Sequence, residues 1–295
     1  SQKVGMGLDL YQKTALGKQY FDRANKIMGV DIQDIIFSGP EDTLKQTQYT
    51  QPAIYIVSVI IGELLMENGI QPSCAAGHSL GEYSALALAK AFDFETGLRL
   101  VKIRAEGMQI SGNQHPGTMA AVLGLDDDQI INICEDFSGG IVVAANFNAA
   151  GQVVISGETD AVQNVMHILK EAGALKVVEL NVSGAFHSPL MKPAKDSLAK
   201  ALESTIINHS EIPVYANVST APVSSADEIR QALIDQLENP VRWHESITRL
   251  IKDGVTSALE VGPGKVLQGL SRRIDRSFNI SGVESLEQIL NFSHV

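Results

Sequence analysis

The segment Gly77-His78-Ser79-Leu80-Gly81 carries the clearest chemical pattern in the sequence. It fits G-x-S-x-G, in which a serine stands on a strained turn between a strand and a helix. We expect both flanking glycines to make room for this turn, and the N-terminus of the helix favours a developing oxyanion. We therefore predict that Ser79 is a nucleophile and that the backbone N–H of Leu80 donates to the oxyanion. The alternative is an ordinary turn in which Ser79 only caps the helix.

A serine nucleophile needs a base, which is most often a histidine. His187 is the candidate among seven histidines, because it follows a predicted strand in the loop 183–189, where the chain returns to the larger domain. His78 stands beside the serine and is poorly placed to fold back on to it. For His187, the alternative is a loop histidine with a structural role only. The remaining histidines lie in a predicted helix, a boundary loop or polar surroundings: His115, His167, His209, His244 and His294.

Arg104 is the third candidate, because its neighbours on a helix carry no charge. The residues three and four positions away are Leu100, Val101, Gly107 and Met108. A guanidinium on such a face needs an anionic partner, because a buried unpaired charge is costly. The partner is either an internal Asp or Glu or a substrate carboxylate, which a two-pronged guanidinium fits well. The sequence leaves both choices open.

The composition narrows the class of protein. Of the 295 residues, 44% are hydrophobic and 19% are charged, as in a globular protein. The net charge of −11 argues against an overall affinity for nucleic acid or anionic membranes. Cys74 and Cys134 are too few for a disulfide framework or a cysteine-rich zinc site. The sequence holds no metal-binding or nucleotide-binding motif, so we expect neither a metal nor a cofactor.

The apolar segments are short. The longest run, residues 53–61, is interrupted by Ser58 and is too short to span a bilayer. The first five residues contain no apolar core of a signal peptide. These observations, together with the low cysteine count, predict a cytoplasmic protein.

Helices and strands alternate along most of the chain. Helices are predicted at residues 15–28, 51–68, 82–90, 94–108, 189–205, 226–237, 243–253 and 265–274, and strands at 73–76, 212–218 and 258–261. In the helix 51–68, Pro52 is expected in the first turn, where its missing N–H costs least. The alternation predicts an α/β domain with a mostly parallel sheet.

The middle of the chain has a different pattern. Strands are predicted at 118–123, 141–146, 152–156 and 174–182, and helices at 126–137 and 159–172. The order is β-α-β-β-α-β, which is the ferredoxin-like unit. We therefore predict an inserted subdomain at residues 117–183 within a discontinuous catalytic domain, residues 1–116 and 184–295.

The chain as a whole resembles the malonyl-CoA:acyl carrier protein transacylases of fatty-acid synthesis. Segments that resemble the family's motifs follow one another in the same order at residues 1–7, 76–85, 146–157, 186–191, 239–243 and 261–267. The resemblance implies an α/β-hydrolase-like domain with a ferredoxin-like insert. It also implies transfer of a malonyl group from malonyl-CoA to the phosphopantetheine thiol of acyl carrier protein.

The same resemblance implies a role for individual residues. Ser79 corresponds to the nucleophile, His187 to the base and Arg104 to the arginine that binds the malonyl carboxylate. Gln236 corresponds to a residue whose backbone carbonyl orients the histidine, so that no Asp is required. A serine hydrolase or thioesterase with water as the acceptor is the rival activity. A non-catalytic binding module is the third possibility.

Two further expectations come from the family pattern. The family's N-terminal motif reads G-Q-G-S-Q after a first strand, and this sequence opens at the serine of that motif, as Ser1. The glutamine that lines the oxyanion hole is therefore absent from these residues, so either the sequence is incomplete or the protein has half an oxyanion hole. Carrier proteins of the family are acidic, so we expect docking on a local basic patch. The candidate residues are Lys265, Arg272, Arg273 and Arg276.

Overall fold

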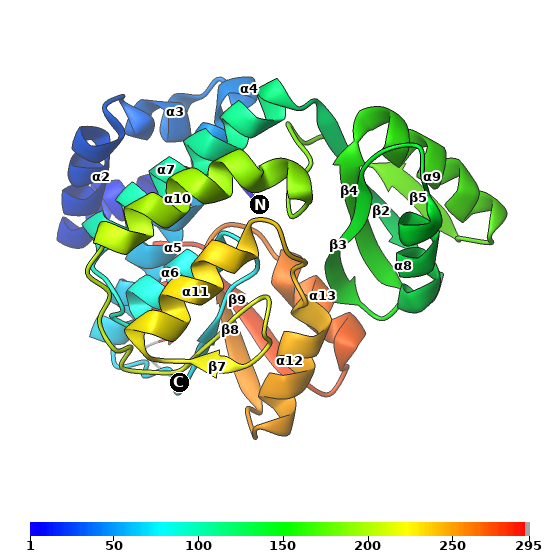
Figure 1. The fold of residues 1–295 in the computed structure, drawn as a ribbon. Coiled ribbons are helices and arrows are strands. Elements are labelled where there is room, and N and C mark those ends of the chain that lie inside the picture. The colour runs from blue at the N-terminus through cyan, green and yellow to red at the C-terminus, as the bar shows by residue number, and fades with distance from the viewer. Residues whose placement is uncertain (293–295) are drawn as a thin grey trace.

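The computed structural model describes residues 1–292 and has two parts. Figure 1 shows a helix-rich body and, beside it, a smaller lobe drawn in green. The body contains α1 (Leu8–Lys13), α2 (Ala15–Met28), α3 (Ile32–Ser38), α4 (Glu41–Leu44), α5 (Thr47–Glu67), α6 (Gly81–Leu88) and α7 (Phe94–Gln114) before the lobe. After the lobe come η1 (Pro189–Met191), α10 (Lys192–Ser204), α11 (Ala226–Gln236), α12 (Trp243–Lys252), α13 (Val266–Ile274) and α14 (Leu286–Phe292). The short helices α1, α3, α4 and α14 were not predicted.

Helix α5 runs through the core of the body. By length and composition it could cross a membrane, but 72% of its most apolar window is buried inside the protein. It packs against α7, α6 and α2, so its apolar residues are used in the core. The predicted start at residue 51 is wrong by about one turn, because the helix begins at Thr47. Pro52 therefore lies inside the helix, beyond its first turn, and is buried.

The body has two small sheets where one mostly parallel sheet was predicted. Strands β1 (Ala75–Ala76) and β6 (Val214–Tyr215) are parallel, and β7 (Pro222–Val223) pairs antiparallel with β6. Strands β8 (Ser257–Val261) and β9 (Asn279–Val283) form a separate parallel pair. The predicted strands 73–76 and 212–218 are shorter than expected. Beyond the C-terminal end of this ladder, the side chain of Asn217 donates to the carbonyl of Gly77 at 2.7 Å.

The lobe follows the predicted order of elements. It consists of β2 (Gly117–Leu123), α8 (Asp127–Asp136), β3 (Val142–Ala149), β4 (Gln152–Glu158), α9 (Thr159–Glu171) and β5 (Lys176–Glu179). The sheet order is β3-β4-β2-β5, and all these neighbours are antiparallel. A hydrophobic cluster that includes Val122, Ile155 and Val165 lies between the sheet and the two helices and is separate from the core of the body. The lobe therefore has its own core.

Backbone hydrogen bonds join the lobe to the body. Val241 donates its N–H to the carbonyl of Ala145 at 2.9 Å and accepts from the N–H of Phe147 at 2.9 Å. Helices α12 and α13 also pack against β3. Since β3 is part of the lobe's own sheet, this pairing fixes the lobe against the segment that leads into α12.

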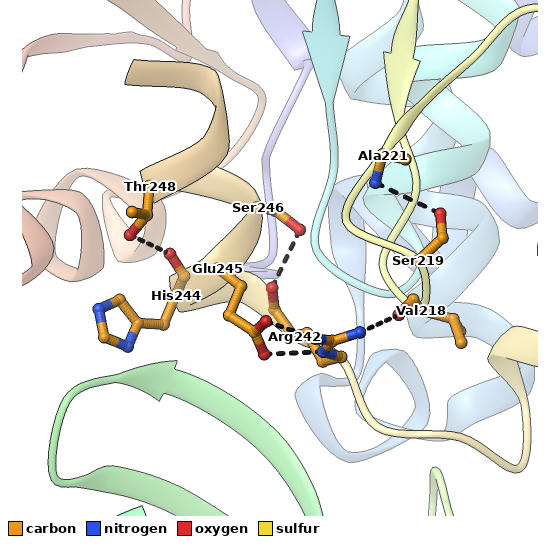
Figure 2. A network of polar contacts seen from close by, with 8 residues as sticks. All are labelled: Val218, Ser219, Ala221, Arg242, His244, Glu245, Ser246 and Thr248. Carbon is orange, nitrogen blue, oxygen red and sulfur yellow. Dashed lines mark hydrogen bonds and ion pairs between the residues drawn. The ribbon is translucent and has the colours of Figure 1, made fainter. Parts of the chain in front are cut away.

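A polar network holds the start of α12 against the loop after β6 (Figure 2). Arg242 forms an ion pair with Glu245 and donates to the carbonyl of Val218 at 3.0 Å. Its backbone N–H donates to the carbonyl of Asn217 at 3.0 Å. The network thus fixes the backbone carbonyls of Asn217 and Val218, and the side chain of Asn217 contacts the turn that carries Ser79.

Candidate active site

The turn between β1 and α6 holds Ser79 in a conformation that residues other than glycine rarely adopt. Its φ is 51°, in the left-handed region, as a strained turn requires. A Cβ on Gly77 would lie 1.9 Å from the carbonyl carbon of Gly81, so only glycine fits there. The expectation for Gly81 is wrong, because a Cβ there would point into open space with no atom within 4 Å. Gly81 contributes its backbone to the close approach, and its missing side chain is not needed.

The side chain of Asn217 fixes the backbone of this turn. Its Oδ1 accepts the N–H of Ser79 at 2.7 Å, while its Nδ2 donates to the carbonyl of Gly77. Asn217 is 1% exposed, so both bonds are shielded from water. Because the N–H of Ser79 already donates to Asn217, the next backbone N–H that could donate to an oxyanion is that of Leu80. Within residues 1–292 no acceptor is recorded for it, and it lies at the N-terminus of α6.

Ser79, His187 and Gln236 meet although they are far apart in the sequence. The Nε2 of His187 lies 2.8 Å from the Oγ of Ser79. Its Nδ1 lies 2.8 Å from the backbone carbonyl oxygen of Gln236, at the end of α11. A carbonyl oxygen only accepts, so Nδ1 carries the proton and Nε2 is free to accept from the serine. No carboxylate is needed to select this tautomer.

His187 is buried and has a depressed pKa. It is 3% exposed, and burial lowers its pKa to about 3, helped by the positive charge of Arg104. The imidazole is therefore neutral at physiological pH and ready to accept a proton. Its φ of 58° is in the left-handed region, which shows that the loop is held in an unusual conformation at this residue.

Arg104 lies beside Ser79 and is 1% exposed. Its Nη2 donates to the Oγ of Ser79 at 2.9 Å and to the Oε1 of Gln236 at 3.0 Å. Its Nη1 donates to the Oε1 of Gln51, and the ring of Tyr83 lies 5.6 Å from the guanidinium carbon. Within residues 1–292 it forms no ion pair with an Asp or Glu. The internal carboxylate partner that the sequence left open is therefore not in direct contact.

Glu82 is a buried carboxylate in this region that sequence reasoning missed. It accepts from the backbone N–H of Asn217 at 2.9 Å and from the Nε2 of Gln236 at 3.0 Å. Burial raises the pKa of Glu82 to about 7, although these hydrogen bonds and the charge of Arg104 oppose the shift. Gln236 therefore stands between Glu82 and Arg104, and it also donates to the carbonyl of Ser79 at 3.0 Å. The sequence did contain a signal for Glu82, because it is a charged residue in the first turn of the otherwise apolar helix α6.

The other predicted features lie elsewhere. His78 does not contact the Ser79 side chain, as predicted, and its Nε2 is bonded to Asn148 of the lobe at 2.8 Å. His294 lies outside the described residues. The four residues of the predicted basic patch, Lys265, Arg272, Arg273 and Arg276, are all exposed around α13. Residues 1–292 contain no group of three or more His, Cys, Asp or Glu that could hold a metal ion.

Ser79 and His187 form a hydrogen-bonded serine–histidine pair of the kind that nucleophilic catalysis uses. The model of the acyl transferase domain family matches residues 1–287. The malonyl CoA-acyl carrier protein transacylase of Bacillus subtilis is 40% identical over 291 residues, which cover 98% of this chain and 92% of the relative. The chain belongs to the malonyl-CoA:acyl carrier protein transacylase family. The corresponding protein of Escherichia coli is 42% identical, over 93% of this chain and 89% of its own.

Solved structures of the family have the same fold. The transacylase from Coxiella burnetii superposes with a TM-score of 0.95 at 37% identity, covering 100% of this chain and 94% of that one. A malonyl-transacylase in complex with its type II PKS acyl-carrier protein also gives a TM-score of 0.95, at 40% identity, covering 99% and 96% of the two chains. The fold of this chain is therefore the α/β fold of the transacylases.

Proposed function

We propose that this protein transfers the malonyl group of malonyl-CoA to the phosphopantetheine thiol of acyl carrier protein, through a malonyl ester on Ser79. The product would supply fatty-acid synthesis. The single observation that carries the choice of acyl group is Arg104, a buried guanidinium 2.9 Å from the nucleophilic oxygen. In a malonyl group one methylene separates the carboxylate from the carbonyl that is attacked, so a guanidinium this close to the serine suits it. A carboxylate would supply the charged partner that Arg104 lacks.

In the first half-reaction, Ser79 attacks the malonyl thioester. His187 takes the Ser79 proton on Nε2, the backbone N–H of Leu80 stabilises the oxyanion, and the CoA thiolate leaves and is protonated from His187. The carbonyl of Gln236 holds the Nδ1–H and stabilises the imidazolium. The bound malonyl carboxylate would also offset the Arg104 charge that lowers the pKa of His187. The substrate would thereby strengthen the base that activates Ser79.

In the second half-reaction, the thiol of the carrier protein replaces CoA. His187 deprotonates the thiol, which attacks the seryl ester, and Ser79 recovers its proton as it leaves. Only the acceptor differs between the two halves, so ping-pong kinetics are expected. Lys265, Arg272, Arg273 and Arg276 are the proposed docking residues for an acidic carrier protein.

We also propose the finer description of the fold and location. The sheet order β3-β4-β2-β5 and the separate core of the lobe support a ferredoxin-like insert at residues 117–183. The strand-turn-helix around Ser79 supports an α/β-hydrolase-like catalytic domain formed by residues 1–116 and 184–295. A cytoplasmic location stays a prediction.

Intact-protein mass spectrometry after addition of malonyl-CoA tests the activity. The protein should gain the mass of one malonyl group, and holo acyl carrier protein should then remove it. Loss of the adduct without carrier protein, with release of malonate, would instead show a hydrolase. Absence of any adduct would show a non-catalytic protein.

Arg104→Ala tests the choice of acyl group. An acetyl group offers no carboxylate, and each charge-assisted hydrogen bond contributes about 1.5–3 kcal/mol, so the wild type should prefer malonyl-CoA by about 100-fold or more. In the variant this ratio of kcat/KM should collapse, while acetyl transfer is kept or improved. Arg99→Ala, at an exposed position on the same helix, is the control and should keep the ratio. An equal fall of both activities in Arg104→Ala would make Arg104 a structural residue.

A further inference from the structure

Two glutamines from different helices hold the guanidinium of Arg104. The Oε1 of Gln51, in α5, accepts from Nη1, and the Oε1 of Gln236, at the end of α11, accepts from Nη2. Both side chains are buried, Gln51 to 7% exposed and Gln236 to 0%. Arg104 itself is on α7, so three helices meet at this group.

Both acceptors are amides, and this has an electrostatic consequence. An amide oxygen fixes the direction of a guanidinium N–H but carries no net charge, so the positive charge of Arg104 is positioned without being neutralised. Glu82, the buried carboxylate of this region, is held away from direct contact by the amide of Gln236, which donates to it at 3.0 Å. A carboxylate in either glutamine position would form an internal ion pair.

We propose that Gln51 is a specificity-determining positioning residue, which keeps Arg104 aimed at the acyl pocket by a neutral hydrogen bond and so leaves its charge for the carboxylate of the acyl group. The inference rests on the proposed role of Arg104. Gln51 acts through Arg104, because no contact of Gln51 with Ser79 or His187 is recorded within residues 1–292.

Gln51 is the better of the two glutamines for a test. The amide and carbonyl of Gln236 also contact Ser79, Glu82 and His187, so a substitution there would disturb the base and the nucleophile. The Nε2 of Gln51 has one recorded contact, with the sulfur of Met108 at 3.2 Å. A sulfur is a weak acceptor, so losing this contact costs little.

The decisive variant is Gln51→Glu, which keeps the shape of the side chain and adds a negative charge. The new carboxylate should pair with Arg104 and compete with the substrate, so kcat/KM for malonyl-CoA should fall about 10- to 100-fold, mainly through KM. Acetyl transfer should change little, so the malonyl-to-acetyl ratio falls. Gln48→Glu, in the first turn of the same helix, adds the same charge away from the recorded Arg104 contacts and should keep the ratio.

Gln51→Met is the second variant and removes the acceptor without adding charge. It should lower the ratio about 3- to 10-fold, because Arg104 then has one orienting hydrogen bond fewer. If Arg104→Ala lowers the ratio but Gln51→Glu keeps the wild-type ratio, the inference about Gln51 is overturned. If Gln51→Glu does not fold, an unchanged ratio in Gln51→Met overturns it in the same way. If Arg104→Ala itself keeps the ratio, the proposed role of Arg104 fails instead.

Discussion

The turn that carries Ser79 and the pocket that holds Arg104 are adjacent but are built in different ways. The turn is made of five consecutive residues, and its strain is concentrated in the backbone of Ser79, with Gly77 allowing the close approach. The pocket is made of single residues from α5, α6, α7 and α11. The pocket is costly in electrostatic terms, because it buries the charge of Arg104 and gives it neutral amide acceptors.

Because the two regions are built differently, they are sensitive to different kinds of substitution. A local turn depends on a few φ values and on one position without a Cβ, so a single methyl group at the wrong place breaks it. The pocket depends on the polarity of each acceptor, so a change of charge with no change of shape is the damaging one. The predictions below test the turn and its base first and the surface last.

The largest effect is expected for Ser79→Ala. Removing the hydroxyl removes the atom to which the acyl group is attached, so no covalent malonyl adduct should form. Intact-protein mass spectrometry with malonyl-CoA measures this directly. An adduct on the Ser79→Ala protein would show that the nucleophile is another residue.

His187→Ala should slow acylation about 100- to 10,000-fold, the usual contribution of a general base. Single-turnover acylation by malonyl-CoA measures the rate. His209→Ala, at an exposed histidine outside the site, should keep the wild-type rate. A near-normal rate in His187→Ala would assign the base to another group.

The pH dependence of kcat/KM reports the protonation of the free enzyme, so it should reflect the depressed pKa of His187, which is about 3. A base with the ordinary pKa of 6.5 would lose activity as the pH falls from 7 to 5, whereas neutral His187 should keep it. The depressed pKa of His187 also affects folding stability. The unfolded chain binds a proton at this residue below its ordinary pKa and the folded chain does not, so the contribution of His187 to stability should rise with pH between about 3 and 6.5.

Gly77→Ala and Gly81→Ala are a matched pair within the turn. The added methyl group at Gly77 collides with backbone, so the free energy of unfolding should fall by about 3 kcal/mol or more. At Gly81, the first residue of α6, the methyl group meets open space, and the change should stay within about 1 kcal/mol. Denaturant unfolding of the two variants compares them. Equal losses would show that both glycines are needed for their missing side chains.

The smallest effect is expected at the surface. Neutralising the proposed patch should slow transfer to carrier protein about 10-fold at low salt and leave acylation by malonyl-CoA unchanged, because rim charges act mainly on the encounter rate. The substituted residues are Lys265, Arg272, Arg273 and Arg276. A control protein with Lys13, Lys18, Lys26 and Arg99 neutralised should retain the wild-type rate. The patch is wrong if both proteins show the same rate and salt dependence.

Much of the molecule was determined by the sequence alone. The lobe was predicted element by element, because its strands are short apolar runs bounded by turn residues and its helices α8 and α9 are amphipathic. The turn at Ser79 was predicted because its motif lies within five residues, whereas Asn217, which fixes the backbone of the turn, lies 138 positions from Ser79. The isolation of Arg104 on an apolar helix face could also be read, since Leu100, Val101 and Met108 are indeed buried.

The tertiary structure decided the remainder. The strands β1 and β6 are two residues long, and beyond their C-terminal end the side chain of Asn217 bonds to the carbonyl of Gly77, a contact that no local pattern predicts. The partners of Arg104, Gln51 and Gln236, are 53 and 132 positions away, and Glu82 reaches Gln236 over 154 positions. Whether a buried charge meets an amide or a carboxylate depends on which side chains the packed helices bring within about 3 Å, and spacing along one helix does not contain that information.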